Sequence, residues 1–235
     1  MGREAAGNVV ITINELLQEK KEINMIFAAA PSQKEFLQYL ILDNTIAWER
    51  INAFHMDEYI GLPANATQGF GNFLNEALFS KVPFKSINYL DGQALSAVEE
   101  CERYSKLLQD NSVDIVCLGI GENGHIAFND PHVADFNDPK DVKVVNLDTV
   151  CRNQQVNDGC FASLDLVPTQ AMTITIPALI KAEYLFCVVP ATNEAEAVLR
   201  TLNGDIDEEC PATILRTEDK AMLYLDKESA SLLKI

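Results

Sequence analysis

The segment LGIGENGHIAFNDP, Leu118–Pro131, decides the fold that we expect of this chain. It follows an apolar run at residues 113–118 that is typical of a buried parallel strand. Three glycines then allow the backbone to turn sharply where the strand ends, namely Gly119, Gly121 and Gly124. His125 follows at once, with the carboxylate of Asp130 shortly after it. Because ligands of open α/β sheets bind beyond the carboxyl ends of the strands, the segment predicts either a proton-transfer site or a tight turn with a structural histidine.

Strands and helices are expected to alternate along the whole chain. Apolar runs predict strands at residues 23–27, 51–54, 87–90, 113–118, 142–147, 172–176, 184–189 and 221–225. Helical periodicity predicts helices at residues 5–19, 32–41, 70–79, 94–108 and 194–202, and a short helix at the C-terminus. This alternation is typical of a three-layer α/β/α sandwich with a mainly parallel, Rossmann-like sheet. With 235 residues, we expect a single domain over residues 1–235.

A second segment, NAFHMDEYIGL at residues 52–62, places carboxylates at the end of another strand. Asp57 and Glu58 stand where the strand at residues 51–54 should end. Together with His125 and Asp130 they form a set suited to general acid–base chemistry. Acidic residues after a strand are most often solvated or cap a helix, so we expect one of Asp57 and Glu58 to have such a role.

At these residues the chain resembles the glucosamine-6-phosphate deaminase/isomerase family. FHMDEYIGL and GIGENGHIAFNDP resemble its two signature segments, in the same order and at a similar separation. The resemblance runs from about Gly2 to the C-terminus and includes NDGCF, AMTITIPAL and ECPATILR at residues 157–161, 171–179 and 209–216. The related 6-phosphogluconolactonases share the fold but usually have DER in place of DEY and a GHTASLFPG-like run in place of GHIAFNDP. The resemblance therefore favours a deaminase over a 6-phosphogluconolactonase.

The resemblance implies roles for four residues. Asp57 matches the base that moves a proton between C1 and C2 of the open-chain sugar, and His125 matches the histidine that assists opening of the ring. Two acidic residues usually orient that histidine. Here Asn123 and Asp130 hold their positions, and Asp130 is one methylene shorter than the usual glutamate, which puts its reach in question.

No cofactor or metal is expected. The implied reaction has no redox step and so needs no nicotinamide. The three histidines, His55, His125 and His132, have no spacing of the HExxH kind that binds a metal.

The phosphate pocket departs most from the family. Its usual Gly-rich loop is replaced by AAAPSQKEF at residues 28–36, where Ser32 keeps a hydroxyl and opens a helix whose amides can bind an anion. Gln155 stands where arginine is common and Glu194 where lysine is common. Arg152 or Lys34 is the expected substitute. The residues predicted to bind the substrate or its phosphate are Ser32, Gln33, Glu58, Gly124, Arg152 and Glu194.

Composition restricts the partners and the compartment. The formal charge of −17, with no basic stripe to offset it, argues against nucleic acid as a partner. No apolar run is long enough to span a membrane, and MGREAAGNVV lacks the core of a signal peptide. The six cysteines have no CxxC spacing and are expected to be reduced thiols. We therefore predict a cytoplasmic protein whose partner is a small-molecule sugar phosphate, and we leave open whether it forms a homo-oligomer.

Three functions remain open at this level. The leading hypothesis is an isomerase that deaminates glucosamine 6-phosphate or its galactosamine epimer. The second is a lactonase-type hydrolase, which the DEY sequence disfavours. The third is a sugar-phosphate-binding homologue with little turnover, which Glu194 and Gln155 favour. We expect the family's first strand to be missing ahead of the helix at residues 5–19, because the chain opens directly in that helix. Residues 131–141 are expected to form a loop, either a lid over the site or a simple connection.

Overall fold

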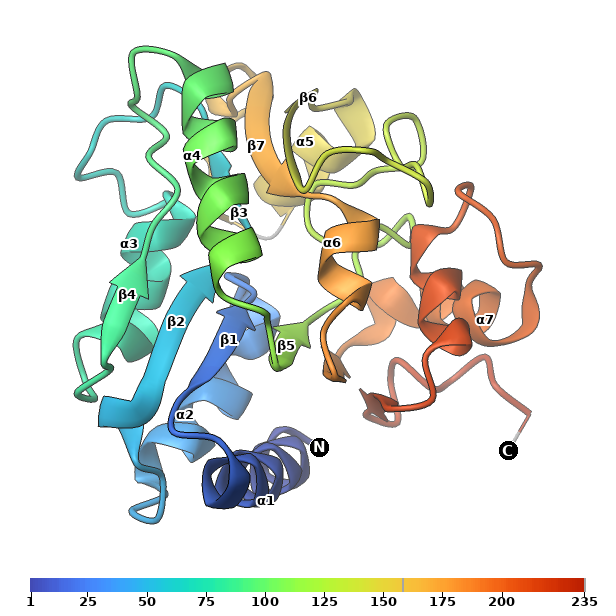
Figure 1. Ribbon diagram of the computed structural model, residues 1–235. Coiled ribbons are helices and arrows are strands. Elements are labelled where there is room, and N and C mark those ends of the chain that lie inside the picture. Colours follow the sequence, from blue (N-terminus) through green and yellow to red (C-terminus); the bar gives the residue numbers. More distant parts are fainter. Residues whose placement is uncertain (158, 235) are drawn as a thin grey trace.

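A six-stranded sheet forms the centre of the computed structural model, which describes residues 1–157 and 159–234. Asp158 of the NDGCF segment and Ile235, the last residue of the expected domain, lie outside the described residues. The strands are β1 (Ile23–Phe27), β2 (Ile51–His55), β4 (Ser86–Asn88), β5 (Ile115–Leu118), β8 (Tyr184–Val189) and β9 (Ala221–Leu225). Their order is β4-β2-β1-β5-β8-β9, and every neighbouring pair is parallel, as Figure 1 shows for β4, β2, β1 and β5.

Helices cover both faces of this sheet, which confirms the predicted sandwich. One face packs against α1 (Gly2–Glu19), α2 (Lys34–Leu42) and α3 (Phe70–Leu74), the last continued by a π-helical segment at Asn75–Phe79. The other face packs against α4 (Ala97–Asp110), α6 (Ile176–Ile180) and α7 (Ala195–Asn203). Successive strand residues alternate between the two cores, because side chains point to opposite faces with a period of two. Met25 and Phe27 belong to the first core, and Ile26 between them belongs to the second.

A second, smaller sheet was not expected. It consists of β3 (Asp57–Tyr59), β7 (Gln170–Ile174) and β6 (Val142–Asn146), in the order β3-β7-β6 and antiparallel throughout. The sequence predicted β6 and β7 as strands but placed them in the main sheet, and it treated Asp57 and Glu58 as loop residues. A three-residue strand such as β3 has too short a pattern to be recognised, since its pairing with β7 joins residues far apart in the chain.

Three other elements differ from the prediction. Helix α5 (Thr149–Asn157) was not predicted, because it buries only Cys151 and so has no apolar face. Helix α6 was not predicted either, because five residues are too few for a helical period. The expected C-terminal helix is wrong: residues 227–232 form turns. Asp226 and Ser229 exchange side-chain hydrogen bonds with each other's backbone amides there, at 2.8 and 3.1 Å, which competes with helical bonding.

Two further expectations concern the chain as a whole. In the part of the chain that the structure describes, no helix is both long and apolar enough to cross a membrane. The idea that a strand is missing ahead of α1 stays a prediction.

Candidate active site

A cavity of about 510 Å³ lies at the carboxyl ends of four parallel strands. Its lining includes residues that follow β1, β2, β5 and β8, at positions 28–34, 56–57, 119–121 and 190–194. Phe70 and Phe73 of α3, with Gln154 and Gln155 of α5, close its sides. This is the position at which open parallel sheets bind ligands, so both signature segments of the sequence reach the same cavity.

The turn after β5 requires glycine where His125 lies over it. The Gly121 amide donates to the His125 carbonyl at 3.0 Å, which folds the histidine back across the turn. A Cβ atom on Gly121 would come within 2.1 Å of the His125 ring, so a side chain at this position would displace the ring. Gly124 has a φ of +86°, and a Cβ atom there would meet the Cys210 sulfur at 2.5 Å. The glycines of this segment therefore shape the turn around the histidine.

The His125 ring is held by two acceptors on the same nitrogen. His125 Nδ1 lies 2.7 Å from Asn123 Oδ1 and 3.2 Å from Asp130 Oδ1. The Asn123 amide nitrogen donates to Asp130 Oδ1 at 2.8 Å, which fixes the amide so that its oxygen faces the ring. Because both neighbours of Nδ1 are acceptors, the proton of a neutral ring resides on Nδ1 and Nε2 is available as the base.

Asp130 is an ionised partner for the histidine. It has no exposed surface, and burial alone would raise the pKa of its carboxyl. The hydrogen bond and charge of His125, with the Asn123 amide, outweigh burial and lower that pKa to about 2. Asp130 thus reaches His125 despite its short side chain, and its negative charge stabilises an imidazolium at Nδ1.

Asp57 lines the cavity from β3 and is almost fully buried, with 6% of its surface exposed. Burial, and next the neighbouring carboxyl of Glu58, raises the pKa of Asp57 well above its usual value. A carboxylate with a raised pKa is a stronger base than an exposed one, as transfer of a proton from carbon requires.

Glu58 does not line the cavity and has a structural role. Its carboxylate accepts hydrogen bonds from the amides of Tyr59, Phe70 and Gly71, at 2.9, 3.1 and 2.8 Å. Two of these amides begin α3, so Glu58 caps that helix at the end where a negative charge is favourable. The expectation that one member of the pair would cap a helix applies to Glu58.

Thr173 connects the strand of Asp57 with the loop of His125. It is fully buried in β7 and stands in register with Asp57 of β3. Its hydroxyl accepts the Phe128 amide at 3.1 Å and donates to the Ile174 carbonyl at 3.1 Å. The side-chain amide of Asn129 donates to the carbonyls of Ile126 and Ile174, each at 2.9 Å. These bonds fix the loop between His125 and Asp130 against the strand that positions Asp57.

The residues predicted to bind phosphate separate into two groups. Ser32, Gln33 and Glu194 line the cavity, as do Lys34 and Gln155. Arg152 does not line it, because its guanidinium donates to the carbonyls of Leu164 and Val167, at 2.6 and 2.8 Å. Gly124 is also outside the lining, since its carbonyl accepts the Ala212 amide at 2.8 Å.

The other two histidines lie away from the cavity. His55 is fully buried and accepts the Leu90 amide on Nε2 at 2.7 Å, and burial lowers its pKa to about 4. His132 is a loop residue whose ring contacts the Asn146 carbonyl at 2.8 Å. Of residues 131–141, all of which are described, none lines the cavity, so this loop has the geometry of a connection rather than a lid.

Sequence reasoning missed several lining residues. Met56, Gln154 and Cys160 belong to the cavity wall, together with Asn193 at the start of the helical segment after β8. Met56 follows β2 and Asn193 follows β8, so their position after a parallel strand was a signal for both. Gln154 lies in α5, which follows β6 of the small antiparallel sheet, so it had no such signal. Thr173 resembles any other buried strand threonine in sequence, so its role depends on the register of β3 and β7.

Comparison with known proteins places this geometry in a family. Residues 1–224 match the family described as "Glucosamine-6-phosphate isomerases/6-phosphogluconolactonase". A glucosamine-6-phosphate deaminase of Listeria monocytogenes is 34% identical over 212 residues, covering 90% of this chain and 88% of the relative. One of Bacillus cereus is 37% identical over 189 residues, covering 80% and 70%.

Solved structures of this family have the same fold as this chain. The chain of a monomeric glucosamine-6-phosphate deaminase superposes with a TM-score of 0.88 at 29% identity, covering 98% of this chain and 95% of that one. A 6-phosphogluconolactonase of Thermotoga maritima shares the fold, with a TM-score of 0.75 at 20% identity over 94% of this chain and 92% of that one.

Replacing Thr173 by valine should lower both stability and turnover. Valine keeps the shape but leaves the buried Phe128 amide without its acceptor, which costs about 1–3 kcal/mol. The loop between His125 and Asp130 then loses its fixed position, and we expect kcat to fall about tenfold or more, since small displacements of catalytic groups are costly. Urea unfolding and steady-state kinetics measure both effects. Thr173→Ser, which keeps the hydroxyl, is the control, and an equal loss in both variants would show that the effect does not come from the hydrogen bonds of the hydroxyl.

Replacing Asp57 by asparagine should raise stability at neutral pH. A group whose pKa is raised by folding stabilises the protein below its unfolded pKa, and that contribution disappears as pH rises through the folded pKa. At pH 7 wild type has lost that contribution, because its buried carboxyl must either ionise or hold a proton that the unfolded chain releases, and the amide carries neither cost. We expect a gain of about 1 kcal/mol or more, or roughly 2–4 °C in Tm. Thermal unfolding between pH 4 and 8 measures it, and a gain that did not shrink toward pH 4 would contradict this cause.

Proposed function

Because the chain belongs to the family of glucosamine-6-phosphate isomerases and 6-phosphogluconolactonases, we propose that it is an aldose–ketose isomerase that releases ammonia from an amino-sugar 6-phosphate. Glucosamine 6-phosphate is the first substrate to test, since the relatives with 33–37% identity are named glucosamine-6-phosphate deaminase. The observation that carries the proposal is that Asp57 and His125 line one cavity, with His125 Nδ1 held by two acceptors.

The ring of the substrate opens first. His125 Nε2 takes the proton of the anomeric hydroxyl and passes it to the ring oxygen, the bond between C1 and the ring oxygen breaks, and the aldehyde forms at C1. Asp130, which stays ionised across the neutral range, stabilises the imidazolium that this exchange creates. Asn123 holds the ring in place but adds no charge.

Asp57 then moves a proton between two carbons. It removes the proton at C2 while the C1 oxygen takes a proton from the neighbouring ammonium, which gives an enolamine with a hydroxyl at C1 and a neutral amino group at C2. It returns the proton to C1, and the enolamine becomes a protonated imine at C2. Water adds to that imine and ammonia leaves, so that a ketose 6-phosphate remains. The positive charge of the substrate ammonium favours the ionised form of Asp57, opposing the effect of burial on its pKa.

A second candidate is a sugar-phosphate-binding homologue with little turnover. The observation that favours it is Glu194 in the cavity lining, where many family members place a lysine toward the phosphate. It predicts that the sugar phosphate binds and that no ammonia is released. Galactosamine 6-phosphate is the alternative substrate, and a lactonase activity is the least supported because the chain has DEY rather than DER.

We also propose a cytoplasmic location. Five cysteines are buried and form no disulfide, which is the usual state of cysteines in a reducing compartment, namely Cys101, Cys117, Cys151, Cys187 and Cys210. Assembly into a homo-oligomer stays a prediction, and size-exclusion chromatography with light scattering measures it.

Ammonia release tests the reaction. Purified protein should release ammonia from glucosamine 6-phosphate or galactosamine 6-phosphate, and Asp57→Asn should lower kcat by at least about 1000-fold while binding of the sugar phosphate persists, because the base is removed and the shape is kept. A coupled assay and calorimetric titration measure both quantities. Near-wild-type turnover in the variant would refute the role of Asp57, and binding without ammonia in wild type would favour the second candidate.

His125→Gln separates ring opening from proton transfer. The variant should lose about 100-fold or more in kcat on the ring-closed amino sugar. It should lose much less on an open-chain analogue, which needs no ring opening. Equal losses on both substrates would show that His125 acts in another step.

A further inference from the structure

One wall of the cavity differs in charge from what a phosphate dianion requires. It is formed by Ser32 and Gln33 after β1 and by Asn193 and Glu194 after β8, and we call it the β1/β8 wall. The side-chain amide of Gln33 ties its two halves together, since it donates to the Val188 carbonyl at 3.1 Å. The wall and Asp57 line the same cavity, so we assign C5 and C6 of a sugar whose C1 and C2 lie at Asp57 to this wall.

The wall offers few donors to an anion. Pro31 has no N–H, and the Gln33 amide is already bonded to the Ala30 carbonyl at 2.9 Å. Both protons of the Gln33 side-chain amide are also in use, one on the Val188 carbonyl and one on Ser32 Oγ at 3.3 Å. The side-chain amide of Asn193 donates to Glu122 Oε1 at 3.2 Å, which places a second carboxylate against a side chain of this wall.

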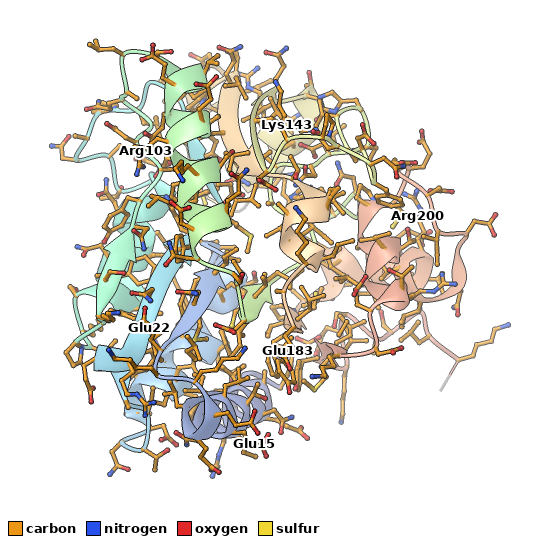
Figure 2. The ribbon with its side chains drawn as sticks, viewed as in Figure 1. Glu15, Glu22, Arg103, Lys143, Glu183 and Arg200 are labelled. Carbon is orange, nitrogen blue, oxygen red and sulfur yellow. The ribbon has the colours of Figure 1, made fainter. Side chains whose placement is uncertain are left out.

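The chain places its cations elsewhere. Within residues 1–157 and 159–234, Lys34 is the one lysine or arginine in the cavity lining, and it is exposed. Several other basic residues lie just ahead of the strands, at the opposite edge of the main sheet. Lys20 pairs with Asp114 at 2.6 Å and Lys220 with Glu183 at 2.7 Å, and Glu22 pairs with Lys85. Figure 2 labels Glu22 and Glu183 near the tails of the strands, away from the strand ends that form the cavity.

A carboxylate on this wall suits a different ligand group. A phosphate dianion carries no proton to donate and is repelled by Glu194 and Glu122, in a protein whose net charge is already −17. A primary hydroxyl donates a hydrogen bond to a carboxylate and carries no charge, so Glu194 can bind it. The wall therefore has the chemistry of a sugar-hydroxyl subsite.

We propose that the β1/β8 wall binds an uncharged hydroxyl at C6, with Glu194 as its acceptor, so that the chain accepts unphosphorylated 2-amino-2-deoxyhexoses as readily as their 6-phosphates. This rests on the proposed function for the chemistry at C1 and C2, and it assigns the opposite end of the substrate. Glu194 is then the residue that sets the specificity for the C6 group.

The test compares glucosamine with glucosamine 6-phosphate. In wild type the two kcat/KM values should lie within about tenfold of each other, because repulsion by Glu194 offsets what the phosphate gains from Lys34. Glu194→Lys should shift the ratio toward the phosphate by about 100-fold, mainly through a lower KM for the phosphorylated sugar, and Glu194→Gln should shift it by about tenfold.

Glu196→Lys is the matched control. Glu196 is exposed on α7 and lies outside the cavity lining, so its replacement changes the net charge of the protein equally without touching the wall. The ratio should stay at the wild-type value. A wild-type preference of more than about 100-fold for the phosphate, or equal shifts in Glu194→Lys and Glu196→Lys, would overturn the proposal.

Binding keeps the two proposals distinguishable. Calorimetric titration of the Asp57→Asn protein with glucosamine and with glucosamine 6-phosphate gives the ratio of Kd values without turnover. If neither sugar releases ammonia in wild type, the proposed function fails, and the Kd ratio still decides the C6 preference. A ratio within about tenfold supports the hydroxyl subsite, and tighter binding of the phosphate by more than about 100-fold refutes it.

Discussion

The register between β3 and β7 is the constraint on which the site depends. It sets Asp57 opposite Thr173, and the Thr173 hydroxyl in turn accepts the Phe128 amide. The Thr173 side chain therefore fixes the loop of His125 relative to the strand that positions Asp57. A slip of one residue would turn Asp57 away from the cavity, because successive strand side chains point to opposite faces. Burial of Thr173 makes any alternative pairing costly, since its hydroxyl would lose both partners.

Two carboxylates of the site differ in environment and so in role. Asp57 faces the cavity from an almost fully buried position beside Glu58, which raises its pKa and makes it a base. Asp130 is more deeply buried but has His125 and Asn123 against it, and its pKa is lowered to about 2. Hydrogen bonds therefore outweigh burial at Asp130 and keep it charged. A site that separates the pKa values of two carboxyls in this way can assign one to proton transfer and the other to stabilising charge.

The distribution of charge follows the direction of the strands. Lysines and carboxylates pair at the amino edge of the main sheet, where Lys20, Asp114 and Glu183 form one cluster. The cavity lies at the carboxyl edge, and its lining includes the carboxylates of Asp57 and Glu194. Among the described residues, Lys34 is the one lysine or arginine in that lining. Ion pairs at exposed positions contribute little to stability, so this arrangement matters more for the ligand than for the fold. It makes the cavity a poor environment for an anion unless the anion reaches Lys34.

The sequence by itself determined the parallel strands, the sandwich and the two segments that meet at the cavity. Apolar runs that end in glycine or acidic residues can be recognised locally, and the carboxyl ends of parallel strands must share an edge. Only the tertiary structure decided that Glu58 caps α3 while its neighbour Asp57 faces the cavity, because both are acidic residues of one short strand. It also decided that the Arg152 guanidinium donates to backbone carbonyls and that Asp130 reaches His125. The bond from the Phe128 amide to Thr173, which joins the loop of His125 to the strand beside Asp57, is likewise a tertiary contact. These outcomes depend on contacts between residues distant in the chain, which no local pattern encodes.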